Sequence, residues 1–288
     1  MTDEPLPQFL MASSALGVFV EGLQTQGQGH IKPLHQYIAL RCVLEGGFAP
    51  EEITPRPGLR AERRPNGVMH LIWDSTAATS DEQTVLGGLK SKNIDVVVSK
   101  PGVGPVVAIS VKGTTGAFRN LINRMEEAIG DSTNLHIMYP GLVYGFFQVI
   151  KANRAGTVGI AANDVAVDAS GNTVTSIRRY HDVLSGLTGR RFVRDDFTRY
   201  EAVGFAMVET IDGARGHVLE SYPPAASPLR PERFFETLFN TYDLRYPYVA
   251  VSMRALERRV WSRDSPALKA LGPEEQWQTR LGYVPRSS

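Results

Sequence analysis

Residues 142–150 read LVYGFFQVI, a run without a charged side chain. An apolar and aromatic run of this length is typical of a strand that is buried on both faces of a sheet. Such a strand needs packed elements above and below it, because either face would otherwise expose apolar area to water. The run therefore constrains the chain to a sheet that is covered by helices.

Hydrophobic periodicity predicts the elements around this strand. Helical spacing covers residues 8–24 and 34–45, strand patterns cover 68–73, 94–98 and 105–112, and a helix is expected over 115–129. The stretch 49–66, rich in proline and arginine, is expected to be a basic loop. The order of helix, three strands, helix and strand predicts an α/β fold with a central mixed sheet flanked by helices.

The second half of the chain predicts further elements of both kinds. Patterns indicate helices over 174–187 and 231–243, paired strands over 202–210 and 217–222, and a last helix that carries Arg254, Arg258 and Arg259. No segment has the composition of an interdomain linker. We therefore expect one domain over 1–288, with its core at about 34–150, and with 151–288 adding strands and helices for DNA contact or oligomerisation.

Composition excludes several classes of protein. Apolar residues make up 42% and charged residues 21% of the 288 positions, which is typical of a globular chain. The single cysteine, Cys42, excludes a disulfide framework and a zinc site built on several thiolates. No apolar run reaches the ~18 residues of a membrane span, and the acidic start MTDEPLPQFL is unlike a signal peptide. We expect a cytoplasmic protein without a membrane partner; its net charge of +1 does not by itself indicate nucleic acid.

The residues most suggestive of chemistry lie on the strand 105–112. Side chains alternate between the faces of a strand, so Ala108, Ser110 and Lys112 share one face. An ammonium on a buried strand needs an acidic partner. Asp95, on the neighbouring strand across a tight turn, is the natural candidate.

The following helix offers a second acid. We take its apolar face as Phe118, Leu121, Ile122, Met125 and Ile129. At ~100° per residue, Glu126 falls at the edge of that face and Glu127 nearly opposite it. Glu126 is thus expected to reach toward the sheet, and Glu127 to be solvated.

An Asp and a Glu beside a strand-borne Lys suit metal-dependent phosphodiester hydrolysis. Carboxylate oxygens hold Mg²⁺, which polarises a phosphate and activates a water, while the lysine orients the attacking hydroxide. In the other interpretation, Asp95 and Lys112 form a buried ion pair and Glu126 is a surface residue. Residue spacing alone leaves both interpretations open.

At these positions the sequence resembles a known family. Asp95 followed by Ser110-Val111-Lys112 resembles the PD-(D/E)XK nuclease signature, with Ser in place of the second acid. Restriction endonucleases that cut CCGG-containing sites share this Ser and recover the acid after thirteen further residues beyond the lysine, and in this chain thirteen residues separate Lys112 from Glu126. The resemblance implies an αβββαβ core over about 34–150. It also implies metal binding by Asp95, Glu126 and the Ser110 backbone, with Lys112 positioning the water.

The resemblance extends to DNA contacts, with departures. Residues 123–126, NRME, are similar to the family's Asn-x-Arg-x-Glu, which implies DNA contacts at Arg119, Asn123 and Arg124. Ile94 stands where the family name has Pro. Only Arg119 matches the Arg-x-Asp-Arg cluster that reads guanines, so CCGG specificity does not carry over. Glu45 resembles an extra acid that many such nucleases place at the end of the preceding helix.

The function that we expect is a Mg²⁺-dependent Type II restriction endonuclease, acting on double-stranded DNA as a homo-oligomer. The alternatives are a nonspecific defence nuclease and, because Ser110 replaces an acid, a non-cleaving DNA-binding module on the same fold. The histidines show no paired metal-binding spacing, and we expect structural or surface roles for all of them: His30, His35, His70, His136, His181 and His217.

Overall fold

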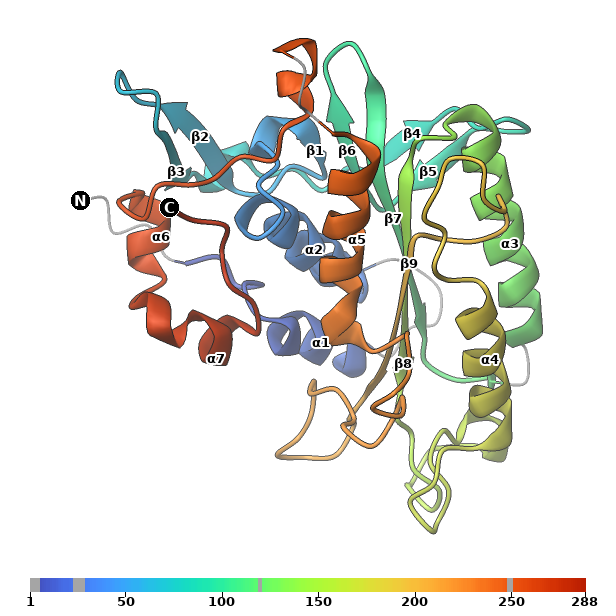
Figure 1. The fold of residues 1–288 in the computed structure, drawn as a ribbon. Coiled ribbons are helices and arrows are strands. Elements are labelled where there is room, and N and C mark those ends of the chain that lie inside the picture. The colour runs from blue at the N-terminus through green and yellow to red at the C-terminus, as the bar shows by residue number, and fades with distance from the viewer. Residues whose placement is uncertain (1–5, 23–28, 119–120, 248–250) are drawn as a thin grey trace.

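The computed structural model describes residues 6–22, 29–118, 121–247 and 251–288. Within these ranges the central sheet has five strands in the order β1–β6–β7–β8–β9 (Figure 1). β6 is antiparallel to β1 and β7, whereas β8 is parallel to β7 and β9. The strands are β1 (Ile53–Thr54), β6 (Val96–Lys100), β7 (Gly104–Thr114), β8 (Val143–Lys151) and β9 (Ala202–Val208). The prediction of a mixed central sheet is confirmed.

Helices cover both faces of this sheet (Figure 1). One face packs against α1 (Ala12–Glu21), α2 (Lys32–Leu44) and α5 (Pro231–Arg245), and the other against α3 (Leu121–Met138) and α4 (Thr175–Gly186). β8 lies between the two layers and is buried at every residue before Lys151. The predicted strand that is buried on both faces is confirmed.

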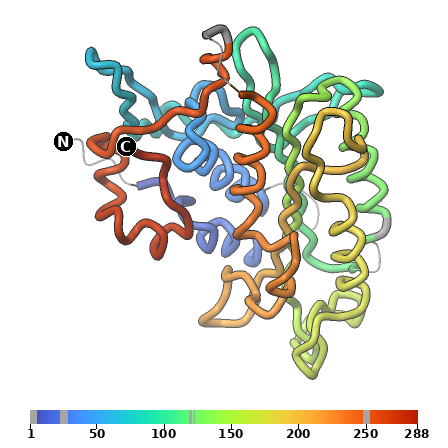
Figure 2. The backbone as a smooth tube through the Cα atoms, in the orientation of Figure 1, coloured from blue at the N-terminus to red at the C-terminus, as the bar shows by residue number. Residues whose placement is uncertain are grey.

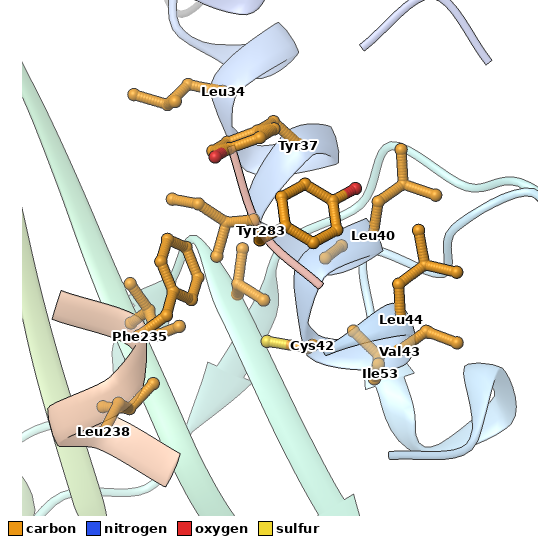
Figure 3. Close-up of a cluster of buried hydrophobic side chains, with 14 of the residues drawn as sticks. Leu34, Tyr37, Leu40, Cys42, Val43, Leu44, Ile53, Phe235, Leu238 and Tyr283 are labelled. Carbon is orange, nitrogen blue, oxygen red and sulfur yellow. The ribbon is translucent and has the colours of Figure 1, made fainter. Parts of the chain in front are cut away.

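α2 is buried around nearly its whole circumference, which is unusual for a helix that covers a sheet. Figure 3 shows Leu34, Tyr37 and Leu40 of α2 in the same cluster as Phe235 of α5 and the nearby Tyr283. Polar side chains on this helix, such as His35 and Arg41, therefore lie in the interior, apart from Lys32 and Gln36.

Smaller elements surround the core. β2 (Leu59–Arg63) pairs with β3 (Met69–Trp73), and β4 (Gln83–Val85) pairs with β5 (Lys92–Ile94). Short helices α6 (Pro266–Ala270) and α7 (Trp277–Leu281) lie near β3 and α1 (Figure 1). The connection from β8 to α4, residues 152–174, extends past the end of the sheet (Figure 2). None of the described helices is both long enough and apolar enough to cross a membrane.

Several sequence-based expectations need correction. The strand predicted at 68–73 forms β3, but it pairs with β2 outside the central sheet, because Asn66-Gly67 closes a local hairpin with residues inside the expected loop 49–66. The helix predicted at 115–129 begins at Leu121 and continues to Met138. Residues 217–222 form only an isolated bridge, Val208 with Val218. Arg258 and Arg259 lie outside the short 3₁₀ helix Val251–Leu256.

Candidate functional site

Asp95 lies at the break between β5 and β6, where the chain leaves the small hairpin and enters the central sheet. Its side chain is almost entirely buried, and Oδ2 accepts a 2.7 Å hydrogen bond from the N–H of Val111. Burial raises the pKa of this carboxyl, and the Val111 amide and the charge of Lys112 oppose that rise only in part. A buried carboxylate with one oxygen held by the backbone presents its second oxygen in a defined direction.

Lys112 projects from β7 on the face that the alternation predicts. Val107, Ile109 and Val111 pack in the core on the α2 side, whereas Ala108 packs on the α3 side. Lys112 and Asp95 both line an open cavity of about 380 Å³. The structure therefore brings this acid and this lysine to one cavity, although the ion pair formed by Lys112 is with Glu127.

His35, in the first turn of α2, brings a third group to Asp95. Its side chain is 4% exposed, and Nε2 lies 3.5 Å from Oδ1 of Asp95. Burial lowers the pKa of His35 to about 4, and nearby Lys32 and Lys112 add to the lowering against the opposing charge of Glu82. The imidazole is thus neutral at neutral pH, and the contact with Asp95 is not an ion pair under those conditions.

Glu82, immediately before β4, completes a cluster of possible metal ligands. One ligand atom from each of His35, Glu82 and Asp95 lies within 4.8 Å of the other two. A divalent cation with bonds of roughly 2.0–2.6 Å needs ligand atoms at about this mutual distance. The three residues come from separate segments of the chain, and the fold alone brings them together.

Two buried atoms of this cluster lack hydrogen-bond partners among the described residues, namely Nε2 of His35 and Oε1 of Glu82. Buried polar atoms are almost always satisfied, because leaving one unpaired costs roughly 1–3 kcal/mol. Both atoms belong to the same cluster, and both have lone pairs available to an electrophile. The residues present therefore fit a bound divalent cation.

Glu127, rather than Glu126, is the acid of α3 that contacts the site lysines. Its Oε1 lies 3.9 Å from Nζ of both Lys112 and Lys92. Glu126 is exposed, and no contact joins it to Lys112. Glu127 is exposed, as expected, although it contacts the lysines. The expectation that Glu126 faces the sheet is wrong, because the buried stripe of the helix runs through Leu121, Met125, Ala128, Ser132 and Leu135.

The remaining predicted site residues lie outside this cluster. The buried hydroxyl of Ser110 forms a 2.7 Å hydrogen bond with the Tyr144 hydroxyl. Asn123 and Arg124 are exposed in the first turn of α3, and Arg124 lies 3.5 Å from Glu127. Arg119 lies outside the described residues. Glu45 pairs with Arg41 at the end of α2 opposite His35, about 15 Å away along the helix axis.

Lysines and a small hairpin form the mouth of the cavity. Lys90, Lys92 and Lys112 all line it. Lys92 also forms a 2.6 Å ion pair with Asp131 of α3. The β4–β5 hairpin is held against α3 by Asn134, whose side-chain oxygen accepts hydrogen bonds from two successive hairpin amides and whose amide donates to a hairpin carbonyl. Figure 1 shows this hairpin beside the upper end of α3.

A second cluster has the residue types of a hydrolase triad but not its setting. The hydroxyl of Ser132 lies 3.2 Å from Nδ1 of His136, whose Nε2 lies 3.3 Å from Glu201. All three side chains are buried, and Glu201 is also paired with Arg190 and Arg245. A nucleophile that substrate cannot reach does no chemistry, so this cluster is structural.

Sequence reasoning missed His35 and Glu82, and it assigned Glu127 to solvent. The signal available for His35 was its place on a helix that is apolar on nearly every side, where a lone imidazole needs a partner. Glu82 lies in a polar loop, TSDEQT, that carries no comparable signal. No family model, curated protein or solved structure matches the chain.

Proposed function

We propose that the chain is a divalent-metal-dependent endonuclease that hydrolyses phosphodiester bonds in double-stranded DNA, as restriction enzymes do. The observation that carries this proposal is the meeting of Asp95 and Lys112 at one open cavity, next to the unpaired carboxylate oxygen of Glu82. Acid and lysine at one accessible place are what phosphodiester hydrolysis requires.

The topology supports the same proposal. α2 precedes the antiparallel β6–β7 pair, and α3 follows it and leads into β8, which is parallel to β7. This order is compatible with the αβββαβ core that the motif resemblance implies. Asp95 directly precedes β6 and Lys112 lies on β7, so the acid and the lysine are carried by the antiparallel pair, in the order of the nuclease signature.

Each residue has a distinct role in the proposed reaction. The carboxylates of Asp95 and Glu82 would hold Mg²⁺, which supplies charge neutralisation at the phosphate and an activated water. The ammonium of Lys112 stabilises the negative charge that develops at the attacked phosphate. Glu127 limits the positions that the Lys112 side chain adopts, because the two charged groups lie 3.9 Å apart.

The proposed substrate matches the charge of the cavity mouth. Lys90 and Lys92 add two ammonium groups to that of Lys112, and phosphates are attracted to such clusters. Asn123 and Arg124 are exposed on the neighbouring turn of α3, where they are available to a DNA backbone. Cleavage of both strands at a palindrome needs two symmetric active sites, so we propose a homo-oligomer as the working form.

The direct test is incubation of plasmid DNA with the protein and Mg²⁺. We expect discrete fragments from the wild type and none from Asp95→Asn, which preserves volume but removes a charged ligand. Asp81→Asn is the matched control, because this exposed acid lies beside Glu82 but outside the cluster. A smear of fragments would favour a nonspecific defence nuclease. Intact DNA with every divalent cation tried would overturn the proposal.

One observation favours the second candidate, a DNA-binding module that does not cleave. Ser110 offers no carboxylate, and its hydroxyl is already bonded to Tyr144 inside the core. Retarded migration of duplex DNA by the wild-type protein, without product in Mg²⁺ or Mn²⁺, would support this candidate. In that case, Asp95→Asn would leave DNA affinity unchanged in metal-free buffer.

A further inference from the structure

The imidazole of His35 is oriented toward the acid cluster and has no other polar partner there. The side chain is only 4% exposed, and Nε2 makes no hydrogen bond within the described part of the chain. Its closest charged neighbour is Oδ1 of Asp95 at 3.5 Å. If the side chain of His35 served only to fill space, an apolar side chain could do so without burying an unpaired nitrogen.

The groups around His35 argue against a structural ion pair. Nε2 of His35 lies 3.5 Å from Oδ1 of Asp95 and forms no hydrogen bond with it or with any other group in the described ranges. The Oδ2 atom of Asp95 is already satisfied by the Val111 amide, which leaves Oδ1 directed toward His35 and Glu82. A buried nitrogen and two carboxylate oxygens that meet without hydrogen bonds between them form an arrangement that a cation bound between them would satisfy.

We propose that Nε2 of His35 is a metal ligand beside Asp95 and Glu82, and that the site consequently binds a first-row transition ion such as Mn²⁺ more tightly than Mg²⁺. This inference rests on the metal-dependent function proposed above, although its test measures binding and not cleavage. With His35 included, the proposed ligands are one imidazole nitrogen and two carboxylate oxygens, instead of carboxylate oxygens alone.

The preference follows from ligand chemistry. Mg²⁺ selects oxygen ligands and retains its waters, so an imidazole adds little to its binding. Mn²⁺, Co²⁺ and Zn²⁺ accept imidazole nitrogen together with carboxylates, with affinities that generally rise in that order. Loss of even an outer partner of a ligand typically costs about 10–100-fold in metal affinity, so loss of the ligand itself costs at least as much.

The experiment uses the full chain and two metals as probes. Titration calorimetry gives Kd for Mn²⁺ and for Mg²⁺ with the wild type, His35→Gln and His70→Gln. His70 is the matched control, because it is a partly exposed histidine of β3 outside the cluster. We expect the wild type to bind Mn²⁺ at least tenfold more tightly than Mg²⁺. His35→Gln should raise Kd for Mn²⁺ at least tenfold and leave Kd for Mg²⁺ within about threefold.

A spectroscopic measurement on the wild type avoids dependence on the folding of the variant. Pulsed electron paramagnetic resonance of bound Mn²⁺ should report coupling to an imidazole nitrogen, and this coupling should persist in His70→Gln. Absence of nitrogen coupling in the wild type would overturn the inference, as would equal Kd values for the two ions. In a folded His35→Gln protein, persistence of the coupling would do the same.

The two proposals fail in different ways. Mn²⁺ bound through His35 without cleavage of any DNA would overturn the endonuclease and leave the ligand assignment standing. DNA cleavage in Mg²⁺, with Mn²⁺ bound equally well by the wild type and His35→Gln, would support the endonuclease and overturn the ligand assignment.

Discussion

The backbone N–H of Val111 donates a 2.7 Å hydrogen bond to Oδ2 of Asp95. This bond ties the acid at the start of β6 to the residue that directly precedes Lys112 on β7. Because the strands are paired next to this point, with Val96 opposite Ile109, neither group shifts without disturbing the sheet. The backbone thus fixes the Asp95 carboxylate relative to the strand that carries Lys112, while the position of the ammonium depends on the side chain and on Glu127.

Lys112→Ala should abolish cleavage while leaving DNA affinity within a few-fold of wild type. The ammonium acts on charge that develops during the reaction, and removing such a group costs on the order of 10² or more in rate. Single-turnover cleavage and gel retardation measure the two effects separately. Lys269→Ala, at an exposed lysine paired with Asp264, is the control and should cleave normally. Cleavage by Lys112→Ala within a few-fold of wild type would contradict the assigned role.

Glu127→Gln should slow cleavage by about tenfold, and Glu126→Gln should change it less than twofold. Glu127 contacts Lys112 and Lys92 at 3.9 Å, so its loss frees both ammonium groups to adopt other positions. Initial cleavage rates under identical Mg²⁺ concentrations make the comparison. An inactive Glu126→Gln beside an active Glu127→Gln would instead support the assignment based on spacing from Lys112.

Ser110→Ala should lower stability by about 1 kcal/mol and leave cleavage within a few-fold of wild type. The hydroxyl is committed to Tyr144 by a buried hydrogen bond, and such a bond contributes roughly 0.5–1.5 kcal/mol. Urea unfolding of Ser110→Ala, Tyr144→Phe and the double variant forms a closed cycle. If the effects of the single variants simply add, the two hydroxyls are not energetically coupled and the interpretation is wrong.

Glu201→Gln should destabilise the protein by about 3–5 kcal/mol at neutral pH. Glu201 is fully buried with Arg190 and Arg245 at 2.5 Å, and removal of one charge leaves the others buried without compensation. Urea unfolding gives the free energy, and Glu220→Gln, at an exposed acid, is the matched control. A loss no larger than that of the control would show that the pairs contribute little.

The same carboxylate should make stability sensitive to acid. Burial raises the pKa of Glu201, but the hydrogen bond and charge of His136 and the charge of Arg245 outweigh it, so that the pKa lies below its usual 4.5. Its contribution is therefore complete above pH 4.5 and is lost as pH falls through the folded-state pKa. The stability difference between wild type and Glu201→Gln should shrink over that acidic range. A difference that grows on acidification would reverse the assigned direction.

The central layers could be predicted because their patterns are local. The uncharged run of β8 and the alternation along β7 are visible in a few residues, and both elements lie within two residues of the predicted limits. The starting point and rotation of α3 could not be predicted in this way. Ile122 and Ile129 shifted the expected stripe by about 50° toward Glu126, while burial of Ala128 and Ser132 depends on α4 and on the segment before β9.

The residues of the candidate site also differ in whether local sequence patterns could place them. Asp95 and Lys112 could be paired from the sequence because a short turn joins their strands. His35 lies 60 residues before Asp95, and nothing near it in sequence indicates which acid it will meet. Glu82 reaches the cluster through a hairpin whose placement depends on Asn134, far along the chain. Such contacts form when the fold brings together residues that are far apart in sequence. The local pattern of apolar residues carries no information about them.

The β4–β5 hairpin forms a sheet of its own and is attached to α3 at its turn. Gly87 and Gly88 allow the hairpin to approach the helix, since a Cβ at either position would overlap Asn134 or Ile137. The side chains of Leu86 and Leu89 in this turn are exposed, although the Leu89 amide donates to Asn134. Insertions at this tip would reshape the rim of the cavity without altering the strands that hold Asp95 and Lys112. The rim of the cavity and the strands beneath it can therefore change independently of each other in evolution.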